Sequence, residues 1–582
     1  MNSERPSFRP RAAWLALPGI WGLGLLGLSW LGLFPGVGLA ARLADTDGLS
    51  PAFTAQLANS QWAVAWTLLA AGIAAAIWRP RPAPGPAGWD RLALPVICLA
   101  GFAGAWAVQS GLFGNIPHVT DATSHWFQAR IFATGRLAAP APPCPAAFYQ
   151  HNVVVGLHGL WHTKYFPGQA LWLIWPLRLV MMPLAFALFL AAAHRIVARH
   201  LDRPTAHAAA AGLAASPLLL LLAGSFMSHL TLLMWMAGGW AFGLRAVDAE
   251  RPGRSFGFAA AAGFCGGMGA LTRAHDAALA GLAIAGFIWF ARPARPFRFG
   301  PILAGLLAGA ALPLGFLLFW NQHLYGSFWA SGYNWAGAAP QSQTPIIRDT
   351  VGFSDGFSGA RALKQSFWTA LRLNQALLGW PAALPLLAPA LLWRPVRRGN
   401  GICLAAAALL YLPYFFFHYY GFELEARYAA ASAPFLVVML ARTLVAGCRR
   451  PAARRPLLAW TAAFFLYAGF FYWPKHVAPR YAGAYEEATP ALPRAAQAAN
   501  LELPAVVLLP DAGFGYSSGF ILNDPLLAAP IVYARDVPGG PACLAAAFPQ
   551  RRLYRYRPDA AAAPSDRFLP IAGPQAESFR RP

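Results

Sequence analysis

The stretch from Pro117 to Leu173 gathers residue types that could carry acid-base chemistry. It contains the aspartate Asp121, the lysine Lys164 and five of the thirteen histidines of the chain: His118, His125, His151, His158 and His162. This polar stretch lies between two hydrophobic runs. Ionisable residues in or beside a membrane usually face water and mark a functional site. Asp121 is therefore the first candidate for a catalytic residue.

Two interpretations of Asp121 are open. Its carboxylate could act as a general base that accepts the proton of an attacking hydroxyl group. It also lies directly before a predicted helix from Ala122 to Thr134, so it could instead cap the amino terminus of that helix. The aromatic residues of the helix, such as Trp126 and Phe127, could lie along the membrane interface as anchors.

Cationic side chains near the same face are candidates to hold a phosphate group. These are Lys164, Arg273 and Arg427, because cations and charge-assisted hydrogen bonds stabilise a departing phosphate. The alternative for Lys164 and Arg427 is that each only anchors the end of a span by extending its charge towards water.

Further residues on this face are candidates with less specific roles: His125, Tyr165, His275, Asp276, Glu423, Glu425 and Tyr428. The carboxylates among them have two interpretations. Any of Asp276, Glu423 and Glu425 could replace Asp121 as the base, or they could merely form ion pairs with Arg273 and Arg427.

A metal site is the weaker interpretation of the histidines. A helix through His118, Asp121 and His125 would bring the three side chains to one face, and histidine with carboxylate suits zinc or manganese. The spacing is not diagnostic, and Pro117 and Thr120 argue against one continuous helix. We expect no required cofactor, with a divalent metal at His118 and His125 as the alternative.

Composition assigns the chain to the membrane proteins. Hydrophobic residues make up 57% and charged residues 12% of the 582 residues, and several apolar runs reach the roughly 20 residues that cross a bilayer. The net charge is +23, but the basic residues form small clusters between apolar runs instead of one continuous basic face. This distribution argues against nucleic acid as a partner.

Thirteen spans are expected in an all-α polytopic protein. They lie near residues 13–34, 61–78, 92–109, 170–193, 207–223, 227–244, 256–271, 277–291, 300–320, 376–393, 402–419, 428–447 and 457–473. A cytoplasmic amino terminus places the arginine clusters between spans inside, as the positive-inside rule requires. It places two large loops outside, at about 110–168 and 321–375, together with everything after Trp473.

The pattern changes after Trp473 from long apolar runs to short ones broken by Pro and Gly. Strands are expected at 505–510, at 531–536 and in RRLYRYRP, with a short helix in ACLAAAF. We therefore divide the chain into a transmembrane module, 1–474, and a small periplasmic α/β domain, 475–582. Cys144 and Cys543 both fall outside, where an oxidising compartment could join them, although sequence cannot supply the geometry that a disulfide needs.

Four motifs resemble those of the bacterial C-type glycosyltransferases of the protein mannosyltransferase and aminoarabinose transferase kind. The family has an aspartate in the first outer loop that leads into A-x-x-x-x-x-G, a K-Y-P-P-G-like segment, an N-x-x-x-Y-G-S segment and an R-Y-x-x-x-x-x-P segment. The matching segments here are DATSHWFQARIFATGRL, KYFPGQALWLIWP, NQHLYGSFWASGY and RYAAASAP. In one departure, Asp121 is followed by Ala122, whereas many relatives have an Asp-Glu pair, so no role of that second carboxylate carries over.

The resemblance implies a C-type glycosyltransferase fold and a specific reaction. A sugar would move from a polyprenyl-phosphate donor to a lipid, glycan or protein acceptor on the external face of the bacterial inner membrane. Asp121 would be the base, the anomeric configuration would invert, and membrane lipids would surround the protein. The alternatives are a lipid-linked glycan ligase or polymerase and a membrane transporter or flippase. A transporter favours broken helices with charges near the membrane midplane, whereas most ionisable residues here lie at span ends.

Overall fold

A computed structural model of the chain describes residues 89–571. It omits residue 176 and residues 291–298, 334–357, 381–382, 385, 418–423, 484, 486–487, 512–514, 559–562 and 564. The spans expected near 13–34 and 61–78 lie outside the described residues, as do Glu423 and residues 334–357 of the second outer loop. The chain forms two compact units. Unit 1 comprises Met1–Ile97, Ala193–Leu219 and Thr350–Arg480, and unit 2 comprises Cys98–Ala192, Leu220–Asp349 and Tyr481–Pro582.

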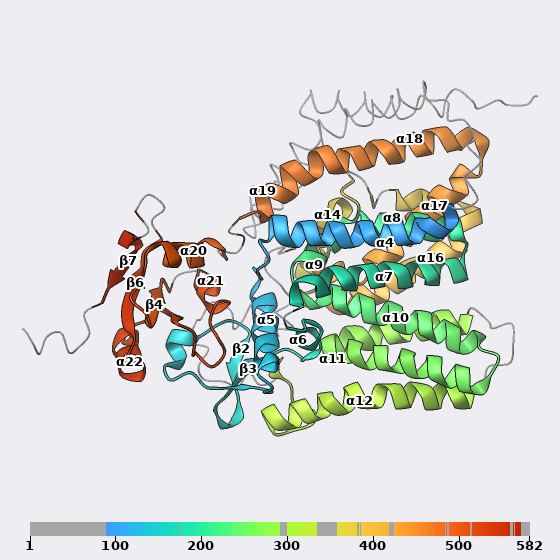
Figure 1. Cartoon of the computed structure of the whole chain (residues 1–582). Coiled ribbons are helices and arrows are strands. Elements are labelled where there is room, and N and C mark those ends of the chain that lie inside the picture. Colours follow the sequence, from blue (N-terminus) through green and yellow to red (C-terminus); the bar gives the residue numbers. More distant parts are fainter. Residues whose placement is uncertain are drawn as a thin grey trace, which may run out of the picture. The chain divides into compact units, whose positions relative to one another are not determined.

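Helices make up most of the described chain (Figure 1). The α-helices are α4 Trp89–Ala107, α5 Thr120–Ala133, α6 Gly168–Trp172, α7 Arg178–His200, α8 Arg203–Ala214, α9 Pro217–Gly224, α10 Ser228–Asp248, α11 Pro252–Phe290, α12 Phe299–Tyr325, α14 Gly359–Ala376, α15 Leu387–Leu392, α16 Arg394–Phe415, α17 Ala433–Cys448, α18 Pro451–Tyr467, α19 Ala478–Tyr481, α20 Ala491–Ala498, α21 Tyr516–Phe520 and α22 Gly540–Ala547. Turns of π-helix extend α4 (η1 Val108–Leu112) and α18 (η5 Ala468–Val477).

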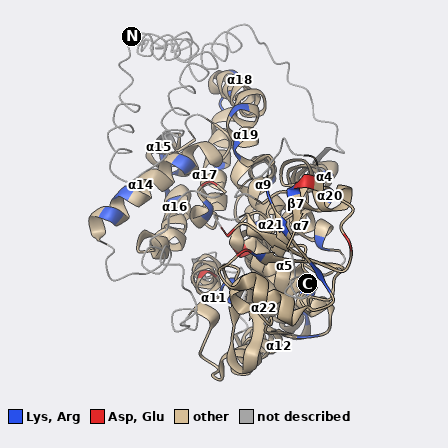
Figure 2. Cartoon of the chain, turned by 90° about the vertical axis from the view of Figure 1, so that its left-hand side faces the viewer, with Lys and Arg blue, Asp and Glu red and all other residues tan. Residues whose placement is uncertain are grey.

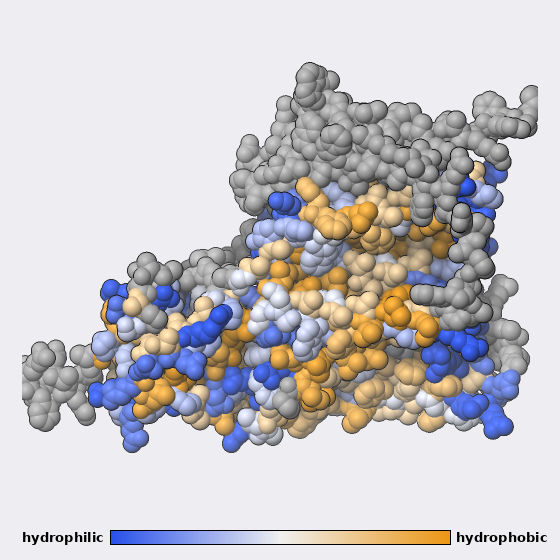
Figure 3. All heavy atoms as spheres, turned by 45° about the horizontal axis from the view of Figure 1, so that its top comes forward, coloured by the Kyte–Doolittle hydropathy of each residue, from blue (hydrophilic) through white to orange (hydrophobic). Residues whose placement is uncertain are grey.

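Within the described residues, six helices are long and apolar enough to cross a membrane, or seven if the bent pair of α8 and α9 is one span. Hydrophobic residues cover much of the surface over the helices in Figure 3. α12 illustrates why, since it exposes large apolar side chains along its length: Leu303, Leu306, Leu307, Leu312, Leu314, Leu318 and Phe319. A helix that is hydrophobic on its exposed side is suited to lipid rather than water. The protein is therefore a membrane protein, while the count of thirteen spans stays a prediction.

Proline explains why two of the expected spans differ from the structure. The span expected at 376–393 is not one helix, because α14 ends at Ala376 and α15 begins only at Leu387. Pro381 and Pro385 lie between them, and proline disfavours helical geometry in the residue before it. The span expected at 170–193 is shifted to α7, which begins after Pro176.

α11 reverses direction near its middle, as the two spans expected at 256–271 and 277–291 require. A Cβ on Gly239 of α10 would lie 3.4 Å from the carbonyl oxygen of Ala262, and one on Gly243 would lie 3.2 Å from the Ile288 side chain. In a straight helix Ala262 and Ile288 would be about 39 Å apart, whereas Gly239 and Gly243 are separated by about 6 Å. The chain therefore turns back at Arg273, whose φ of −153° and ψ of 88° are not helical.

The segment at about 110–168, called the first outer loop after its expected position, is an ordered structure built around α5. It contains the strands β1 Ala139–Pro140, β2 Val153–Val155 and β3 Leu160–Thr163, which form an antiparallel sheet in the order β1-β3-β2. Three short 3-10 segments in unit 2 and one in unit 1 complete the described elements: η2 Pro145–Phe148, η3 Leu157–Gly159, η7 Ser565–Arg567 and η4 Arg427–Ala429.

The segment after Tyr481 contains a second sheet. Its strands are β4 Ala505–Leu509, β5 Ile531–Arg535, β6 Arg552–Tyr556 and β7 Phe568–Pro570, in the order β5-β4-β6-β7. β4 runs parallel to both β5 and β6, and β7 is antiparallel to β6. All five residues of β4 are buried, as expected for an apolar central strand in a parallel arrangement. The strands and the helix α22 lie where the sequence pattern places them.

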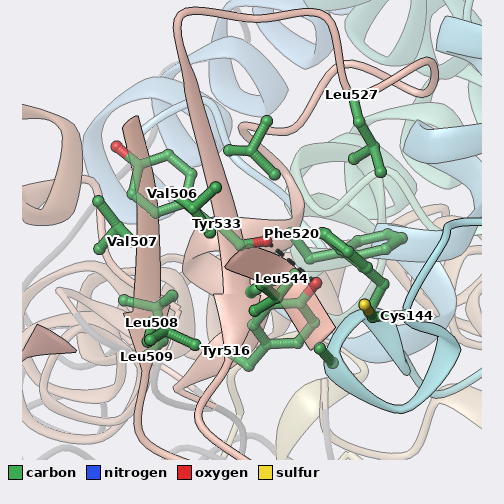
Figure 4. Packing of buried hydrophobic residues seen from close by; sticks show 14 of the residues in the cluster. Cys144, Val506, Val507, Leu508, Leu509, Tyr516, Phe520, Leu527, Tyr533 and Leu544 are labelled. Atoms are coloured by element: carbon green, nitrogen blue, oxygen red, sulfur yellow. Dashed lines mark hydrogen bonds between the residues drawn. The ribbon is translucent and has the colours of Figure 1, made fainter. Parts of the chain in front are cut away.

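The first outer loop and this sheet share one hydrophobic core. Phe127 of α5 packs against Trp161 of β3 and Phe520 of α21, with ring centroids 4.6 Å and 5.0 Å apart. Figure 4 shows Cys144 and Phe520 in the same cluster as the side chains of β4 and β5. Burying an aromatic side chain of this size stabilises a fold by about 2–3 kcal/mol. The division into domains at residue 475 stays a prediction. The two segments on either side of that boundary contribute to the same core.

Unit 1 is held by helix packing and a few buried polar contacts. Gly212 of α8 lets α17 approach closely, because a Cβ there would lie 3.0 Å from Val437. Asn400 donates to the Ala390 carbonyl oxygen and to the Thr443 hydroxyl.

Figure 2 shows Lys and Arg along α14, a helix whose basic residues include Arg361.

A disulfide between Cys144 and Cys543 links the first outer loop to α22. We expect Cys144→Ser to lower the free energy of unfolding by about 3 kcal/mol, because the bond closes a very long loop of the unfolded chain. Thermal unfolding of the purified protein, with and without reductant, measures this effect.

Cys448→Ser is the matched control, since that thiol is free. The disulfide assignment is wrong if the reductant lowers the melting temperature of Cys144→Ser as much as that of the unmodified protein.

Candidate active site

Asp121 lies in the first turn of α5 and does not cap it. The N-cap residue is Val119, whose backbone is extended and which makes no side-chain cap hydrogen bond. The amide of Thr123 donates to the Val119 carbonyl oxygen, so the helix already begins one residue before Asp121. The capping interpretation of Asp121 is therefore wrong, although a carboxylate in the first turn still interacts favourably with the helix dipole.

Two side chains from the first outer loop hold the Asp121 carboxylate. Its Oδ1 accepts a hydrogen bond from Asn152 Nδ2 at 2.8 Å and another from Tyr165 Oη at 2.7 Å. Asn152 also donates to the Thr120 hydroxyl at 3.1 Å. A carboxylate that accepts from two such donors keeps a fixed orientation. Asp121 is half-buried, so this arrangement presents an oriented acceptor at the edge of a packed core.

Lys164 lies beside this carboxylate. Its ammonium group is 5.2 Å from the centroid of the Tyr165 ring and 5.9 Å from that of Tyr333. Burial lowers the pKa of Lys164, and the negative charge of Asp121 opposes that shift. Gly332 explains how Tyr333 reaches this position, because any Cβ on Gly332 would overlap the Lys164 carbonyl oxygen, at 2.0 Å. Two of the motifs found in the sequence, at Lys164 and at Gly332, thus meet at a backbone contact.

His125 lies on α5 one turn after Asp121, and its side chain is 2% exposed. Its ring centroid is 5.0 Å from that of Tyr165. Burial lowers the pKa of His125 to about 4, with Asp121 acting in the opposite direction and Arg273 adding to the decrease. The imidazole is therefore neutral at pH 7. Its Nδ1 makes no hydrogen bond to any described residue, which leaves one polar atom for a bound group.

The reversal in α11 brings Arg273, His275 and Asp276 to the amino-terminal end of α10. Arg273 Nε donates to Asp276 Oδ2 at 2.5 Å, and Arg273 Nη1 lies 3.4 Å from the hydroxyl of Ser228, the first residue of α10. His275 Nε2 lies 3.7 Å from Asp276 Oδ1. Asp276 is therefore in an ion pair with Arg273, which was one of the two roles expected for it.

α6 joins this end of α11 to the loop that carries Lys164. A Cβ on Gly168 would lie 2.5 Å from the Thr272 hydroxyl oxygen, so only glycine allows the two backbones to approach so closely. Tyr165 contacts both His125 and Asp121, so the approach of Gly168 to Thr272 places Asp121, Lys164, His125 and Arg273 in one region of unit 2.

Three further candidates, Glu425, Arg427 and Tyr428, belong to unit 1. Arg427 Nη2 donates to Tyr428 Oη at 3.1 Å, and its guanidinium lies 4.9 Å from the centroid of the Tyr428 ring. Glu425 Oε2 lies 3.6 Å from Arg372 Nη1, and both side chains are 4% exposed. Glu425 thus has a buried cationic partner in Arg372.

His118 holds two backbone segments together through its imidazole ring. Its Nδ1 lies 2.8 Å from the Tyr485 carbonyl oxygen, and its Nε2 lies 2.9 Å from that of Phe113. Both nitrogens are thus engaged with backbone. Within residues 89–571, as far as they are described, no three His, Cys, Asp or Glu side chains lie close enough to hold a metal ion. Whether a divalent metal binds at His118 and His125 is not tested by these contacts, and the expectation of no required cofactor stays a prediction.

Sequence reasoning missed Asn152, Tyr333 and Ser228. Asn152 lies in a turn with φ of 66°, and asparagine is one of the few residues that adopt this conformation readily, but no spacing rule connects it to Asp121. The sequence contained a signal for Tyr333, because this residue ends the NQHLYGSFWASGY segment.

Among solved structures, the chain is similar to ArnT from Cupriavidus metallidurans bound to undecaprenyl phosphate. The sequence identity is 14% and the TM-score is 0.47, over 81% of this chain and 93% of that chain. It is also similar to the archaeal oligosaccharyltransferase AglB from Archaeoglobus fulgidus in complex with an inhibitory peptide and a dolichol-phosphate, with 11% identity and a TM-score of 0.45 over 80% and 70% of the two chains. No family model matches the sequence, and no curated protein does.

Gly332→Ala tests the contact with Lys164. The added Cβ would meet backbone rather than a flexible side chain, so one of the two segments must move. We expect the free energy of unfolding to fall by about 1–3 kcal/mol, measured as a lower melting temperature. In the control variant, Gly315→Ala in α12, a Cβ meets nothing within 4 Å. Equal melting temperatures for the two variants would contradict the packing described here.

His162 of β3 predicts a loss of stability in acid. Burial lowers its pKa to about 4 from an ordinary value of 6.5, and the carbonyl of Thr163 only partly opposes this. The unfolded chain therefore binds a proton between pH 6.5 and 4 that the folded chain does not, and stability falls as the pH decreases through that window. At pH 5 the effect of His162 is about 2 kcal/mol.

We expect His162→Gln to reduce the drop in melting temperature between pH 7 and pH 5. The exposed His158 provides the control variant His158→Gln, which should keep the full drop. An unchanged drop in His162→Gln would show that the acid sensitivity comes from other groups.

Proposed function

We propose that this chain is an integral membrane glycosyltransferase that moves a sugar from a polyprenyl-phosphate donor to an acceptor on the external face. One observation carries the proposal: the Asp121 carboxylate is oriented by Asn152 and Tyr165 beside the ammonium of Lys164. An oriented carboxylate next to a cation is the pair that such a transfer requires. The polyprenyl-phosphate donor comes from the resemblance of the motifs.

In the proposed sugar transfer, Asp121 is the base and the polyprenyl phosphate is the leaving group. The acceptor hydroxyl attacks the anomeric carbon, and Asp121 takes its proton as the new C–O bond forms. The bond between the anomeric carbon and the phosphate oxygen breaks, and its electron pair leaves with the polyprenyl phosphate. Attack opposite to the leaving group inverts the configuration at the anomeric carbon.

Two cations of unit 2 are suited to the phosphate. Lys164 is held on the rings of Tyr165 and Tyr333, and Arg273 is oriented by Asp276 and Ser228. A cation fixed before the reaction stabilises developing charge without reorganising. Neutral His125 can donate or accept one hydrogen bond to the same substrate. Arg427 remains a third candidate from its motif.

A position outside the cytoplasm suits the site. Disulfides persist in oxidising compartments. The bond between Cys144 and Cys543 links the first outer loop to α22. We place this region in the periplasm, on the outer side of the inner membrane, with the amino terminus inside.

A transporter is the less favoured function. Asp121 and Lys164 lie between the candidate spans Arg91–Leu112 and Arg178–His200 and not within either of them. A transporter would place such charges inside broken helices near the midplane. Their position beside a folded loop supports chemistry at the membrane surface.

Asp121→Asn tests the base. Purified full-length protein is offered a panel of polyprenyl-phosphate sugars with crude membrane acceptors, and the released polyprenyl phosphate is measured. We expect the variant to lose activity by about 10²–10⁴-fold while it still binds the donor, because the amide cannot take the proton. Tyr165→Phe should lose less, since it removes only one hydrogen bond to the carboxylate.

Asp566→Asn is the matched control, because Asp566 is exposed and its carboxylate accepts a hydrogen bond from the hydroxyl of its neighbour Ser565. Equal turnover by Asp121→Asn and Asp566→Asn would assign the base to another carboxylate. If the unmodified protein consumes no donor of the panel, the transferase proposal itself is wrong.

A further inference from the structure

Helix α14 turns a strip of apolar side chains away from the rest of unit 1. Leu363 is 65% exposed and Phe367 is 40% exposed, and Ala370 is exposed as well. Residues spaced by three and four positions are neighbours on one face of a helix. Trp368 and Thr369 point away from this face and are buried. α14 is therefore amphipathic, and Leu363, Phe367 and Ala370 form its apolar strip.

The other side of α14 is held at one end of α16. Gln365 Nε2 donates to the Phe417 carbonyl oxygen at 2.7 Å, and Tyr411 Oη donates to the Ser366 hydroxyl oxygen at 3.3 Å. Both contacts lie near Phe415, where α16 ends. These hydrogen bonds fix which face of α14 points away from the unit, so the exposure of the apolar strip is a property of the fold.

α14 lies across the direction of a membrane-spanning helix of its own unit. Figure 2 shows α14 lengthwise, whereas α18 of the same unit is seen nearly end-on. α18 belongs to the candidate span Pro451–Tyr481. A helix that crosses a span at a large angle runs along the bilayer surface. The orientation of α14 is therefore that of a helix lying on the membrane and not through it.

The apolar surface of α16 continues to the end that α14 contacts. Leu412 is 53% exposed and Phe416 is 54% exposed, and they are the sequence neighbours of the contact residues Tyr411 and Phe417. Exposed apolar side chains of this size suit lipid rather than water. α14 thus meets α16 where a lipid-facing surface reaches the end of that helix, so the apolar strip continues this surface.

Basic residues indicate the side of the membrane and the kind of lipid. α16 begins with Arg394, Arg397 and Arg398, and the positive-inside rule places that end in the cytoplasm and α14 at the external surface. The basic residues of α14 are Arg361, Lys364 and Arg372, and its sequence contains no acidic residue. Arg372 is buried beside Glu425, whereas Arg361 is exposed. An exposed cation next to an apolar strip attracts an anionic lipid surface.

We propose that α14 binds the surface of an anionic lipid bilayer as an interfacial helix. The side chains of Leu363 and Phe367 lie below the headgroups, and the Arg361 guanidinium lies among the lipid phosphates. Burial of apolar area and attraction of cations to anionic lipids act together in such helices. Asp121, Lys164 and Arg273 are not part of α14, so the proposal does not depend on the transferase function.

The experiment measures the depth of a nitroxide label in the full-length protein, reconstituted in phosphatidylglycerol vesicles. Leu363→Cys carries the label, and Ser565→Cys is the matched control, because Ser565 is exposed in the segment after Tyr481. Electron paramagnetic resonance compares the collisions of each label with oxygen, which concentrates in the bilayer, and with a water-soluble nickel chelate. Serine replaces the free cysteines, which are Cys98, Cys265, Cys403 and Cys448.

We expect the label at position 363 to collide more often with oxygen than with the chelate, and the label at position 565 to do the reverse. More frequent collisions with the chelate at position 363 overturn the proposal. A label at position 363 that neither reagent reaches overturns it as well, because another part of the chain or a second copy then covers the apolar strip.

The same measurement in phosphatidylcholine vesicles tests the preference for anionic lipid. We expect the label at position 363 to lie less deep there, because the attraction of Arg361 to lipid phosphates is weaker without net negative charge. Arg361→Gln should remove the difference between the two lipids. The control Arg254→Gln, which removes an exposed arginine at the start of α11, should keep it. Equal depth in both lipids overturns the assignment to an anionic surface.

A further measurement needs no substitution, in case the labelled variants do not fold. A phosphatidylglycerol analogue with photoreactive groups along its acyl chain is crosslinked to the unmodified protein in vesicles, and the modified peptides are identified. Adducts within residues 360–370 support the proposal. α12 is the internal control, because it is a candidate span whose Leu312 is 74% exposed. Adducts on α12 with none within residues 360–370 contradict the proposal.

Discussion

The position of Asp121 depends on the hydrophobic core that α5 shares with the C-terminal sheet. Phe127 is clamped between Trp161 and Phe520, so α5 can neither rotate nor slide without opening that core. The polar contacts of Asp121 then require little further ordering, because Asn152 and Tyr165 belong to the loop that supplies Trp161. Packing fixes the helix, and two hydrogen bonds fix the carboxylate.

Burial and the charge of Asp121 shift the pKa values of its neighbours in opposite directions. Burial keeps His125 neutral and lowers the pKa of Lys164, while the carboxylate favours the charged form of both. A group with a perturbed pKa beside a specific charge partner is typical of functional sites. Arg273 contributes a second cation, but its ion pair with Asp276 balances part of its charge.

The sequence predicted long elements well and contacts between them poorly. The apolar runs that became α10 and α12 and the short strands β4 and β5 follow from local composition. The failures lie where proline and glycine interrupt such runs, as between α14 and α15, or where a partner comes from a distant loop. Asp121 became a candidate because it is charged in an apolar setting. Asn152 was missed because an asparagine in a turn is common, and Arg372, the buried partner of Glu425, was missed because no spacing rule connects the two residues.

The shared core also has a consequence for synthesis of the protein. Cys144 and Cys543 are 399 residues apart in sequence, and a ribosome needs about 20 to 80 s to add that many residues. During this interval α5 and the first outer loop lack the surface formed by Phe520 and β4, so their apolar side chains have no final partner. The loop must therefore remain incomplete until the last strands arrive, and a chaperone or the membrane surface can cover its apolar side chains during that time.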